Sequence, residues 1–585
     1  MEETHWADSV IFFSVGGDAN SPAIVLNIDR KMKKVIAALL ALVVGMGSAA
    51  AQQDRFNIGG LVIDPSGVTA MDMFNYSQHS HTFGTARSAA MAGAMTSLGG
   101  DMSVLSINPA GLGMYRTNEA TITPMIGVIR SANSASSFED NSATRFSMSN
   151  FGVVCKAYEG TGKIIAVNLG FVYNRLADFN YTTSFYSPGN QSSIANVFAR
   201  QLQQSGMTSS DFYDSKDYFD WWRIDPKYWG AALGYRCGLV YDRDGEGKQS
   251  VWAPDMYGVS PSVNQYTTLE SKGSLGEYAF SFGMNINNKV YVGATLGMQS
   301  LYQRRELYYG EEYSYASGNA PAGNEVRYFN YNQTSTVDGA GVNLKVGVTY
   351  RPIKSLRLGV AVHTPTLYSL DFSYQAAMLS KVVDNQTNRP VSPDPEAMTE
   401  IWRDNGPNSW NFASPVRLLL GASYMFGNKA IISVDYERDW YNSIRSKKTP
   451  VGKGVYNDFF RQYCKGSNTI RVGAEVKPIP ILGIRAGYSF NGSMVKDEMT
   501  VFSSPMTYQT HYGTAGVGVS FGYIFVDLAY QYLSERQTDY CLFYSLDQTG
   551  ELNSQGNIEL HDDFSSIFST RRTRHNVIMT LGFRF

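Results

Sequence analysis

The chain ends in Asn576–Phe585, the ten-residue stretch NVIMTLGFRF, in which every second side chain is apolar. The apolar set is Val577, Met579, Leu581, Phe583 and Phe585, and it alternates with Asn576, Ile578, Thr580, Gly582 and Arg584. Successive side chains of a β-strand point to opposite faces, so a period of two residues indicates a strand. One face of this strand is uniformly apolar and the other is mixed.

The same alternation recurs along the chain after Arg116. It is clearest in residues 342–350, 432–437 and 470–477, where one face is apolar and the other mixes glycine with charged residues. A soluble β-sandwich alternates in the same way, because its apolar face packs on a core. Alternation alone therefore leaves a sandwich and a membrane barrel open.

Two further features favour the membrane barrel. Aromatic residues collect at the ends of the apolar faces, as in the girdles of outer-membrane barrels, and they are Tyr350, Tyr424, Tyr488, Phe490, Tyr530, Tyr532, Phe583 and Phe585. The connections between strands also alternate in length. The tight ones include 351–354, 427–428 and 477–480, and the longest are 176–275, 366–414 and 534–574.

About fourteen segments fit this pattern, in keeping with the even strand number of bacterial outer-membrane barrels. They are 118–130, 145–158, 162–175, 276–287, 289–302, 337–351, 355–364, 415–426, 429–440, 467–477, 481–490, 512–521, 523–533 and 575–585. In hydrocarbon every backbone polar group needs an internal partner, and a closed sheet supplies one. We therefore expect an all-β fold, a transmembrane antiparallel β-barrel over residues 117–585 with long extracellular loops at 176–275, 366–414 and 534–574.

The barrel assigns the other face of each strand to the lumen. This face would carry the charges Arg417, Asp435, Glu437, Arg471, Glu475 and Arg485, which we interpret as solvated wall residues. The formal net charge of the chain is only −2, and no block of like charges occurs, which gives no indication of a nucleic-acid partner. Charged residues make up 17% of the chain, against about 25% in a typical soluble protein.

The N-terminal region has the pattern of an export signal. Met32-Lys33-Lys34 precedes an apolar run at 35–46 and the exit Ala49-Ala50-Ala51-Gln52, so residues 32–51 are predicted to be a signal peptide. Residues 1–31 are then expected to be an upstream extension from a misassigned start. The cysteines show no CxxC and no metal-ligand spacing, which speaks against a disulfide framework or a zinc site, and the pairing of Cys237, Cys464 and Cys541 stays open.

Between the signal peptide and the first strand lies a small, apolar stretch at Gly84–Gly113, GTARSAAMAGAMTSLGGDMSVLSINPAGLG. Its only charges are Arg87 and Asp101, and its glycines weaken any long helix. The proline at position 109 makes Asn108 extended and favours a turn. Such a segment cannot form a core by itself and must be enclosed by the barrel. Met91 and Met95 would present an adaptable apolar surface to a ligand.

A signal peptide, this segment and a barrel ending in Phe585 together resemble the FadL/TodX family of outer-membrane transporters for hydrophobic compounds. The specific part of the resemblance is the segment Arg87–Leu112 with Asn108-Pro109-Ala110. The resemblance implies that residues 52–116 form a hatch inside the lumen, to which Asn108, Pro109 and Ala110 belong. It implies capture of ligand by the outer loops, a lumen site, and sideways release through a gap beside a kinked strand.

The resemblance also implies the partners and the location of the protein. The expected partners are a hydrophobic small molecule such as a long-chain fatty acid or an aromatic hydrocarbon, outer-membrane lipid, and the barrel-assembly machinery, which would recognise the terminal strand with Phe585. We expect a monomer in the outer membrane of a Gram-negative-type bacterium, with no enzymatic activity and no cofactor or metal.

Several alternatives stay open at this stage. A general diffusion porin and a receptor for haem or another surface ligand are the rival functions, and a barrel lipase is disfavoured because no GxSxG motif occurs. His79-Ser80-His81 fits a metal or haem ligand set, or two solvated histidines on a loop. Residues 193–207 place apolar side chains near one helical face, which fits either a ligand-capture helix or a helix packed on the barrel rim.

Overall fold

The structure is a computed structural model of the chain, which separates into two units, residues 1–52 and 53–585. All described residues belong to the second unit, so the predicted extension at 1–31 and the signal peptide at 32–51 lie outside them. The structure describes residues 62–65, 67–79, 83–133, 141–213, 219–242, 252–254, 261–316, 324–384, 387, 389, 396–401, 409–448, 453–496, 500–501, 504–505, 509–540, 543–545, 563–564 and 568–585.

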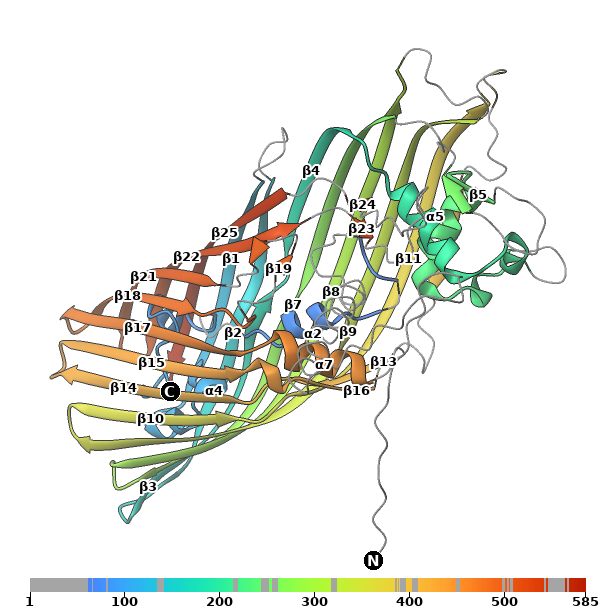
Figure 1. The fold of residues 1–585 in the computed structure, drawn as a ribbon. Helices are drawn as coiled ribbons and strands as arrows, with labels where there is room; N and C mark the ends of the chain where they lie inside the picture. Colours follow the sequence, from blue (N-terminus) through green and yellow to red (C-terminus); the bar gives the residue numbers. More distant parts are fainter. Residues whose placement is uncertain are drawn as a thin grey trace, which may run out of the picture. The chain divides into compact units, whose positions relative to one another are not determined.

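Fourteen antiparallel strands close into a barrel, as predicted (Figure 1). Each strand pairs with the next, and the last, β25, pairs with β1 to close the sheet. Each predicted strand corresponds to one of them. Their bounds are β1 Glu119–Asn133, β2 Asn141–Glu159, β3 Ile164–Asp178, β7 Ser262–Ile286, β8 Val290–Ser314, β9 Asn324–Ile353, β10 Leu356–His363, β14 Arg417–Phe426, β15 Ala430–Trp440, β17 Gly466–Ile479, β18 Leu482–Asn491, β21 Thr510–Phe521, β22 Ile524–Tyr540 and β25 Phe568–Arg584.

The outward face of the barrel carries an apolar band bounded by aromatic side chains. On β8 the outward residues run from Val290 through Leu296 and Met298 to Tyr302, and Leu296 and Met298 are nearly half exposed. The next outward residue is Arg304, and the outward face is polar from there on. A band of this height matches the hydrocarbon core of a bilayer. The outer-leaflet boundary therefore lies between Tyr302 and Arg304.

Short turns join the strands at the other, periplasmic end of the band. The turn between β7 and β8 contains Asn287 and Asn288, both with positive φ (53° and 52°), the conformation that a two-residue hairpin turn requires and that asparagine tolerates. The chain terminus lies at the same end, where the backbone N–H of Phe585 donates to the carbonyl of Asn118 at 3.1 Å. The role of Phe585 in barrel assembly stays a prediction.

The long connections are not simple loops, which corrects the expectation for 176–275 and 366–414. The first contains β4 (Tyr181–Asn190) and the outer half of β7, and the second contains β11 (Leu367–Asp384), β12 (Glu396–Ile401) and β13 (Ser409–Ala413). On the extracellular side of the band, the apolar residues of the strands face inward and the polar residues face outward. On β9, Phe329, Tyr331 and Val337 face inward and are buried, while the outward face is polar. The lipid-facing pattern therefore ends although the strands continue.

Helices cover the inner face of these outer strands. They are α5 (Ile194–Ser205), α6 (Trp229–Arg236) and α7 (Lys453–Tyr463). The remaining short elements are η2 Ser209–Phe212, η3 Trp221–Arg223, η4 Pro226–Tyr228, η5 Tyr441–Ser443, β5 Val240–Asp242, β6 Trp252–Pro254, β16 Arg445–Lys448, β19 Thr500–Val501, β20 Ser504–Pro505, β23 Tyr544–Ser545 and β24 Asp563–Phe564. Within the described residues, no helix has the length and apolarity needed to cross a bilayer.

The helix expected at 193–207 is α5, and it packs on the barrel wall. Ser193 caps its first turn, and Gly206, in the left-handed conformation, follows its last. The ring of Phe198 packs edge-on against Tyr331 of β9, with 5.8 Å between ring centroids. Glu311 accepts hydrogen bonds from the Ser193 hydroxyl and from the Ile194 N–H. The apolar face of α5 is therefore buried in a core.

Three cysteines lie within the described residues, and none forms a disulfide there. Cys155 is exposed, whereas Cys237 and Cys464 are buried, and Cys541 lies outside the described residues. Burial raises the pKa of the Cys464 thiol, which follows α7 on the extracellular side, to about 12. This thiol is therefore protonated and unreactive at neutral pH.

Candidate functional site

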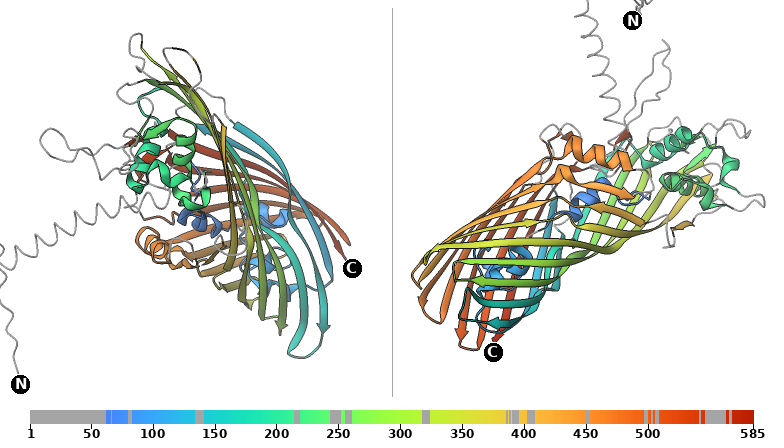
Figure 2. Two further views of the ribbon diagram at one scale, coloured as in Figure 1. Left: turned by 90° about the vertical axis from the view of Figure 1, so that its right-hand side faces the viewer. Right: turned by 90° about the horizontal axis from the view of Figure 1, so that it is seen from below.

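The segment before β1 forms a hatch of short helices, α2 (Ala70–Tyr76), α3 (Ala86–Ala90), α4 (Val104–Ile107) and η1 (Pro109–Met114). Figure 2 shows it, in blue, enclosed by the strands. Thr69 and Asp72 form a reciprocal capping box at the start of α2. Helix α3 ends after five residues, where Ala92 and Gly93 take positive φ values of 53° and 74°. The glycines thus break the stretch into turns, as expected.

The Asn108-Pro109-Ala110 motif joins the hatch to the barrel wall. Because a proline follows, Asn108 is extended, with φ −135° and ψ 101°. Its side-chain oxygen accepts from the Ala110 N–H at 3.1 Å and caps η1. Its amide nitrogen donates to the carbonyl of Thr96 at 2.6 Å and to Thr349 of β9 at 3.3 Å. One side chain therefore fixes a turn of the hatch and its position on the wall.

Glycines of the wall form a seat against which the hatch backbone lies. A Cβ atom at Gly473 would lie 2.7 Å from the carbonyl oxygen of Met91, and one at Gly359 would lie 2.8 Å from the Cα of Ser97. A Cβ at Gly347 would overlap the side chain of Asn108. The seat comprises Gly283, Gly293, Gly347, Gly359, Gly421, Gly473, Gly487 and Gly516. The lumen at this level is filled by protein atoms, with no room for an added methyl group at these positions.

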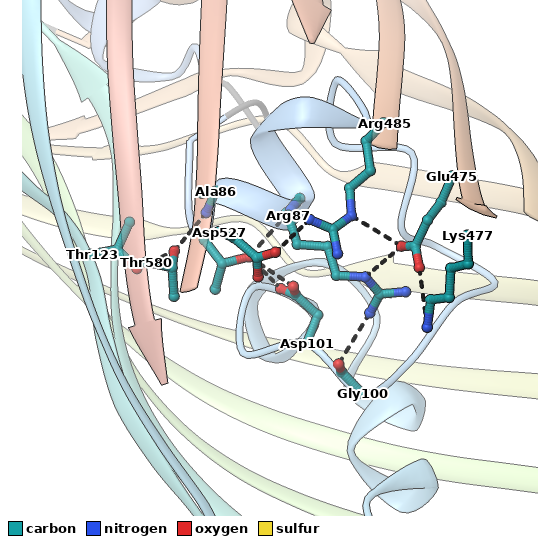
Figure 3. A network of polar contacts seen from close by, with 12 residues as sticks. Ala86, Arg87, Gly100, Asp101, Thr123, Glu475, Lys477, Arg485, Asp527 and Thr580 are labelled. Atoms are coloured by element: carbon teal, nitrogen blue, oxygen red, sulfur yellow. Dashed lines mark hydrogen bonds and ion pairs between the residues drawn. The ribbon is translucent and has the colours of Figure 1, made fainter. Parts of the chain in front are cut away.

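A buried ionic network holds α3 against the opposite wall (Figure 3). Arg87 donates to Glu475 of β17 at 2.9 Å and to the carbonyl of Gly100 at 3.1 Å. Glu475 also accepts from Arg485 of β18 at 3.1 Å, and Arg485 pairs with Asp527 of β22. Glu475 is thus shared between a hatch arginine and a wall arginine.

We expect Glu475→Gln to destabilise the seated hatch. The amide cannot compensate the charges of Arg87 and Arg485, but both arginines keep one partner, so the expected cost is about 1.5 kcal/mol in the free energy of unfolding. The measurement is the urea midpoint of the purified barrel in detergent, followed by heat-modifiable mobility. Lys477→Gln is the matched control, because Lys477 contacts the same carboxylate from an exposed position, 3.5 Å away. Equal midpoints for the two variants would contradict the prediction.

The remaining predicted lumen charges also lie inside the barrel and are buried. Arg417 donates to the carbonyl of Ser77 and lies 3.5 Å from Glu437. Arg471 pairs with Glu437, and Asp435 accepts from the Thr96 N–H at 2.7 Å. The structure therefore brings the predicted charges into contacts with the hatch or with one another, where solvated wall residues were expected.

Met91 and Met95 occupy a different place from the expected ligand surface. Both are fully buried in a cluster between the hatch and the wall, together with Val154, Val172 and Leu419. Their flexible side chains fill the space between the hatch and the barrel wall. The surface that a ligand can reach lies higher in the lumen.

That surface lines a cavity of about 300 Å³ above the hatch. Its floor and one side come from residues 62–83, and its other sides come from the β3–β4 junction and the outer ends of β15, β17, β18, β21, β22 and β25. The apolar lining includes Ile63, Met71, Phe83, Leu176, Phe179, Phe185, Leu269, Met494 and Leu533. Residues 62–79 were expected within the hatch but not as the lining of a cavity, although the Thr69-x-x-Asp72 capping pattern marks the start of α2.

The charged groups around the cavity are paired with one another. Asp72 accepts two hydrogen bonds from Arg305, at 2.9 and 3.3 Å, and Asp178 lies 3.2 Å from Arg574. His79 of the His79-Ser80-His81 motif also lines the cavity, whereas residues 80–82 lie outside the described residues. In the described part of the chain, no three His, Cys, Asp or Glu side chains form a group that could hold a metal ion. Arg572, which also lines the cavity, lies over the ring of Tyr181, 4.0 Å from the ring centroid. The cavity thus combines apolar with polar surface.

Beside the cavity, the sheet separates between β2 and β3. The two strands pair only from Asn150 to Glu159 of β2, and above this point β2 pairs with β1 alone. Strand β3 bulges between Arg175 and Ala177 and continues as β4, which pairs with β7. The junction contacts β25, through the ion pair of Asp178 with Arg574. Strand β3 is therefore the kinked strand, and its junction lines the cavity.

The separation of β2 from β3 begins at the level of the lipid-facing band. Phe146 of β2, at its edge, is 72% exposed and lies opposite Ile126 of β1, which in turn lies opposite Val577 of β25. Ile126 and Val577 face lipid. A cavity, a bulged strand and an interrupted sheet thus meet near the outer edge of the lipid-facing band.

Comparison with solved structures finds matches of low sequence identity. A FadL homologue of Pseudomonas aeruginosa matches with 10% identity, over 85% of this chain and 98% of that one, with a TM-score of 0.45. The monoaromatic hydrocarbon channel CymD matches with 12% identity (87% and 99%, TM-score 0.44), and the toluene transporter TbuX of Ralstonia pickettii with 13% (88% and 100%, TM-score 0.43). No family model and no curated protein matches. Likeness at this level does not establish what this chain transports.

The class of the protein follows from its own geometry. A closed fourteen-stranded sheet with an apolar outward band, aromatic girdles, short periplasmic turns and a filled lumen is a transmembrane β-barrel of the outer-membrane type with an internal hatch. This is the architecture that the resemblance to the FadL/TodX family implied.

Proposed function

We propose that this protein is a passive channel for hydrophobic small molecules across the outer membrane, with long-chain fatty acids or aromatic hydrocarbons as the substrate class. The observation that carries the proposal is the cavity above a seated hatch, beside the separation of β2 from β3. A substrate enters the cavity from outside and leaves sideways into the outer leaflet. The free energy of an apolar molecule falls along that path, because the molecule leaves water first for the protein and then for lipid.

The cavity suits an apolar guest of modest size. Its volume lies at the lower end of the range for small-molecule sites, about 300–1,000 Å³. Each methylene buried against its apolar lining contributes about 0.8 kcal/mol. Arg305 and Arg574 of the lining are paired with Asp72 and Asp178, which leaves the apolar part of the lining to bind an apolar guest.

Close packing of the hatch disfavours the diffusion-porin alternative. A diffusion porin needs a water-filled lumen, whereas here the hatch backbone lies against the wall glycines.

The test is uptake by liposomes that contain the purified, folded protein. We expect entry of a labelled fatty acid such as oleate, or of toluene, to saturate with concentration, while a labelled sugar is excluded. Empty liposomes and liposomes with heat-unfolded protein provide the background. Free passage of the sugar together with the absence of binding of both hydrophobes would overturn the proposal.

A further inference from the structure

The outward face of β21, β22, β25 and β1 carries basic side chains directly above the apolar band. In β-sheet register, Tyr532, His575 and Val128 lie side by side, and the next row outward contains His511, Ser534, Thr573 and Arg130. One row further out, Arg571 lies opposite Ala132. We call Arg130, Arg571, His511 and His575 the basic patch. Below it, Ile126, Val577 and Leu528 are nearly half exposed and face lipid.

The positive charge of the basic patch is not compensated by the protein. Arg130 and Arg571 are both exposed, and within the described residues neither has an ion-pair or hydrogen-bond partner. The outward positions of 128–132, 511–513, 530–534 and 571–577 include no Asp or Glu. On β7 and β8, in the first outward row beyond Tyr302, Lys272 lies 2.9 Å from Glu270 and Arg304 lies 2.6 Å from Glu306. The two sides of the barrel therefore differ in charge.

Two histidine–tyrosine pairs flank the arginines. The hydroxyl of Tyr488 lies 2.7 Å from Nδ1 of His511, and the hydroxyl of Tyr530 lies 2.7 Å from Nδ1 of His575. When the hydroxyl donates to Nδ1, the proton of the imidazole resides on Nε2, which can then donate to another group. Each pair is thus oriented to offer an N–H at the membrane boundary.

We propose that the basic patch binds the phosphorylated headgroup of an outer-leaflet glycolipid. The planar, forked guanidinium groups of Arg130 and Arg571 match phosphate oxygens, and the histidine Nε2–H groups add neutral donors. The patch continues the lipid-facing surface, so a headgroup bound there leaves its acyl chains along Ile126, Val577 and Leu528. Position and charge together select a phosphorylated lipid as the occupant. This inference is independent of the proposed transport.

The experiment titrates the folded barrel in detergent with bis-phosphorylated lipid A and counts bound lipid by native mass spectrometry. We expect Arg130→Gln/Arg571→Gln to weaken binding by about tenfold or more, because each change removes a charge-assisted hydrogen bond. The matched control, Lys272→Gln/Arg304→Gln, removes the same charge from the paired side and is expected to bind as the wild type. Arg130→Lys/Arg571→Lys is expected to retain most of the binding, and heat-modifiable mobility confirms folding of each variant.

Two further arms identify the ligand. Dephosphorylated lipid A is expected to bind weakly to the wild type, and inorganic phosphate is expected to compete only at far higher concentration than lipid A. Equal binding of the phosphorylated and dephosphorylated lipids, or wild-type binding by the glutamine variant, would overturn the proposal. Competition by inorganic phosphate at the concentration of lipid A would show a free-phosphate site and would refute the lipid assignment.

Discussion

Replacement of Gly347 by valine is expected to unseat the hatch and to make the barrel leak small polar solutes. A Cβ at this position overlaps the side chain of Asn108, and Pro109 lies 3.2 Å away, so the hatch turn has to move. Overpacking of this kind costs about 3 kcal/mol, which lowers the ratio of seated to unseated hatch by about a hundredfold. Sugar influx into liposomes, measured by swelling rate, is expected to rise accordingly.

The control for this variant places the same residue where space exists. Gly513 of β21 has no atom within 4 Å of an added Cβ, so Gly513→Val is expected to keep the sugar-tight state. Asn108→Ala combined with Gly347→Val removes the overlapping side chain and is expected to restore part of the seal. A sugar-tight Gly347→Val barrel, or a leak of equal size in Gly513→Val, would show that the glycine seat does not hold the hatch.

Replacement of Ala177 by tryptophan is expected to abolish most hydrophobe uptake while the barrel stays sealed to sugars. Ala177 lies at the bulge of β3 and lines the cavity beside the separation from β2. An indole there occupies the space of several ligand methylenes. Exclusion of three of them removes about 2.4 kcal/mol of binding free energy, equivalent to about fiftyfold in apparent affinity. The measurement is the concentration that half-saturates oleate uptake in liposomes.

Ala422→Trp is the matched control, because Ala422 of β14 is exposed on the outward face, where an indole meets lipid. We expect this variant to transport as the wild type. Unchanged half-saturation in Ala177→Trp would place the transport path elsewhere. A sugar leak in Ala177→Trp would instead indicate damage to the hatch, which swelling assays detect separately.

The strands of the barrel were predictable within the band. In β25 and in the inner halves of β8 and β9, lipid faces one side of the strand over the whole height of the hydrocarbon layer, and the alternation is uninterrupted. Outside the band, lipid no longer contacts the outward face of the strands. The outer half of β9 turns its apolar residues, such as Phe329 and Tyr331, inward onto helices, and its outward face becomes polar. The lipid-facing pattern therefore predicts these strands only within the band, and their outer halves resemble loops in the sequence.

The candidate site was predictable only in part. The segment at 84–113 is so apolar and so rich in glycine and alanine that burial was its only stable option, and Asn108-Pro109 determined its turn locally. The partner of Asn108 was not predictable, because Thr349 and Gly347 belong to β9 and reach the motif only when the sheet closes. The sequence does not distinguish the glycines of the seat from other glycines of the strands. Only the register of the closed sheet brings them together as a seat.

The sequence by itself determined the membrane class and the strand number, because both depend on local patterns: the period of two, the turn residues and the scarcity of charge. The hatch was expected from the resemblance of the segment at 84–113 to the FadL/TodX family. The tertiary structure decided where the cavity lies and where the sheet separates. Asp178 pairs with Arg574 of β25, and Phe83 and Leu176 line the same cavity. Such proximities arise from the curvature and register of a closed sheet. Neither segment shows them as a periodic pattern in its sequence, because the alternation within a strand depends only on which face is buried.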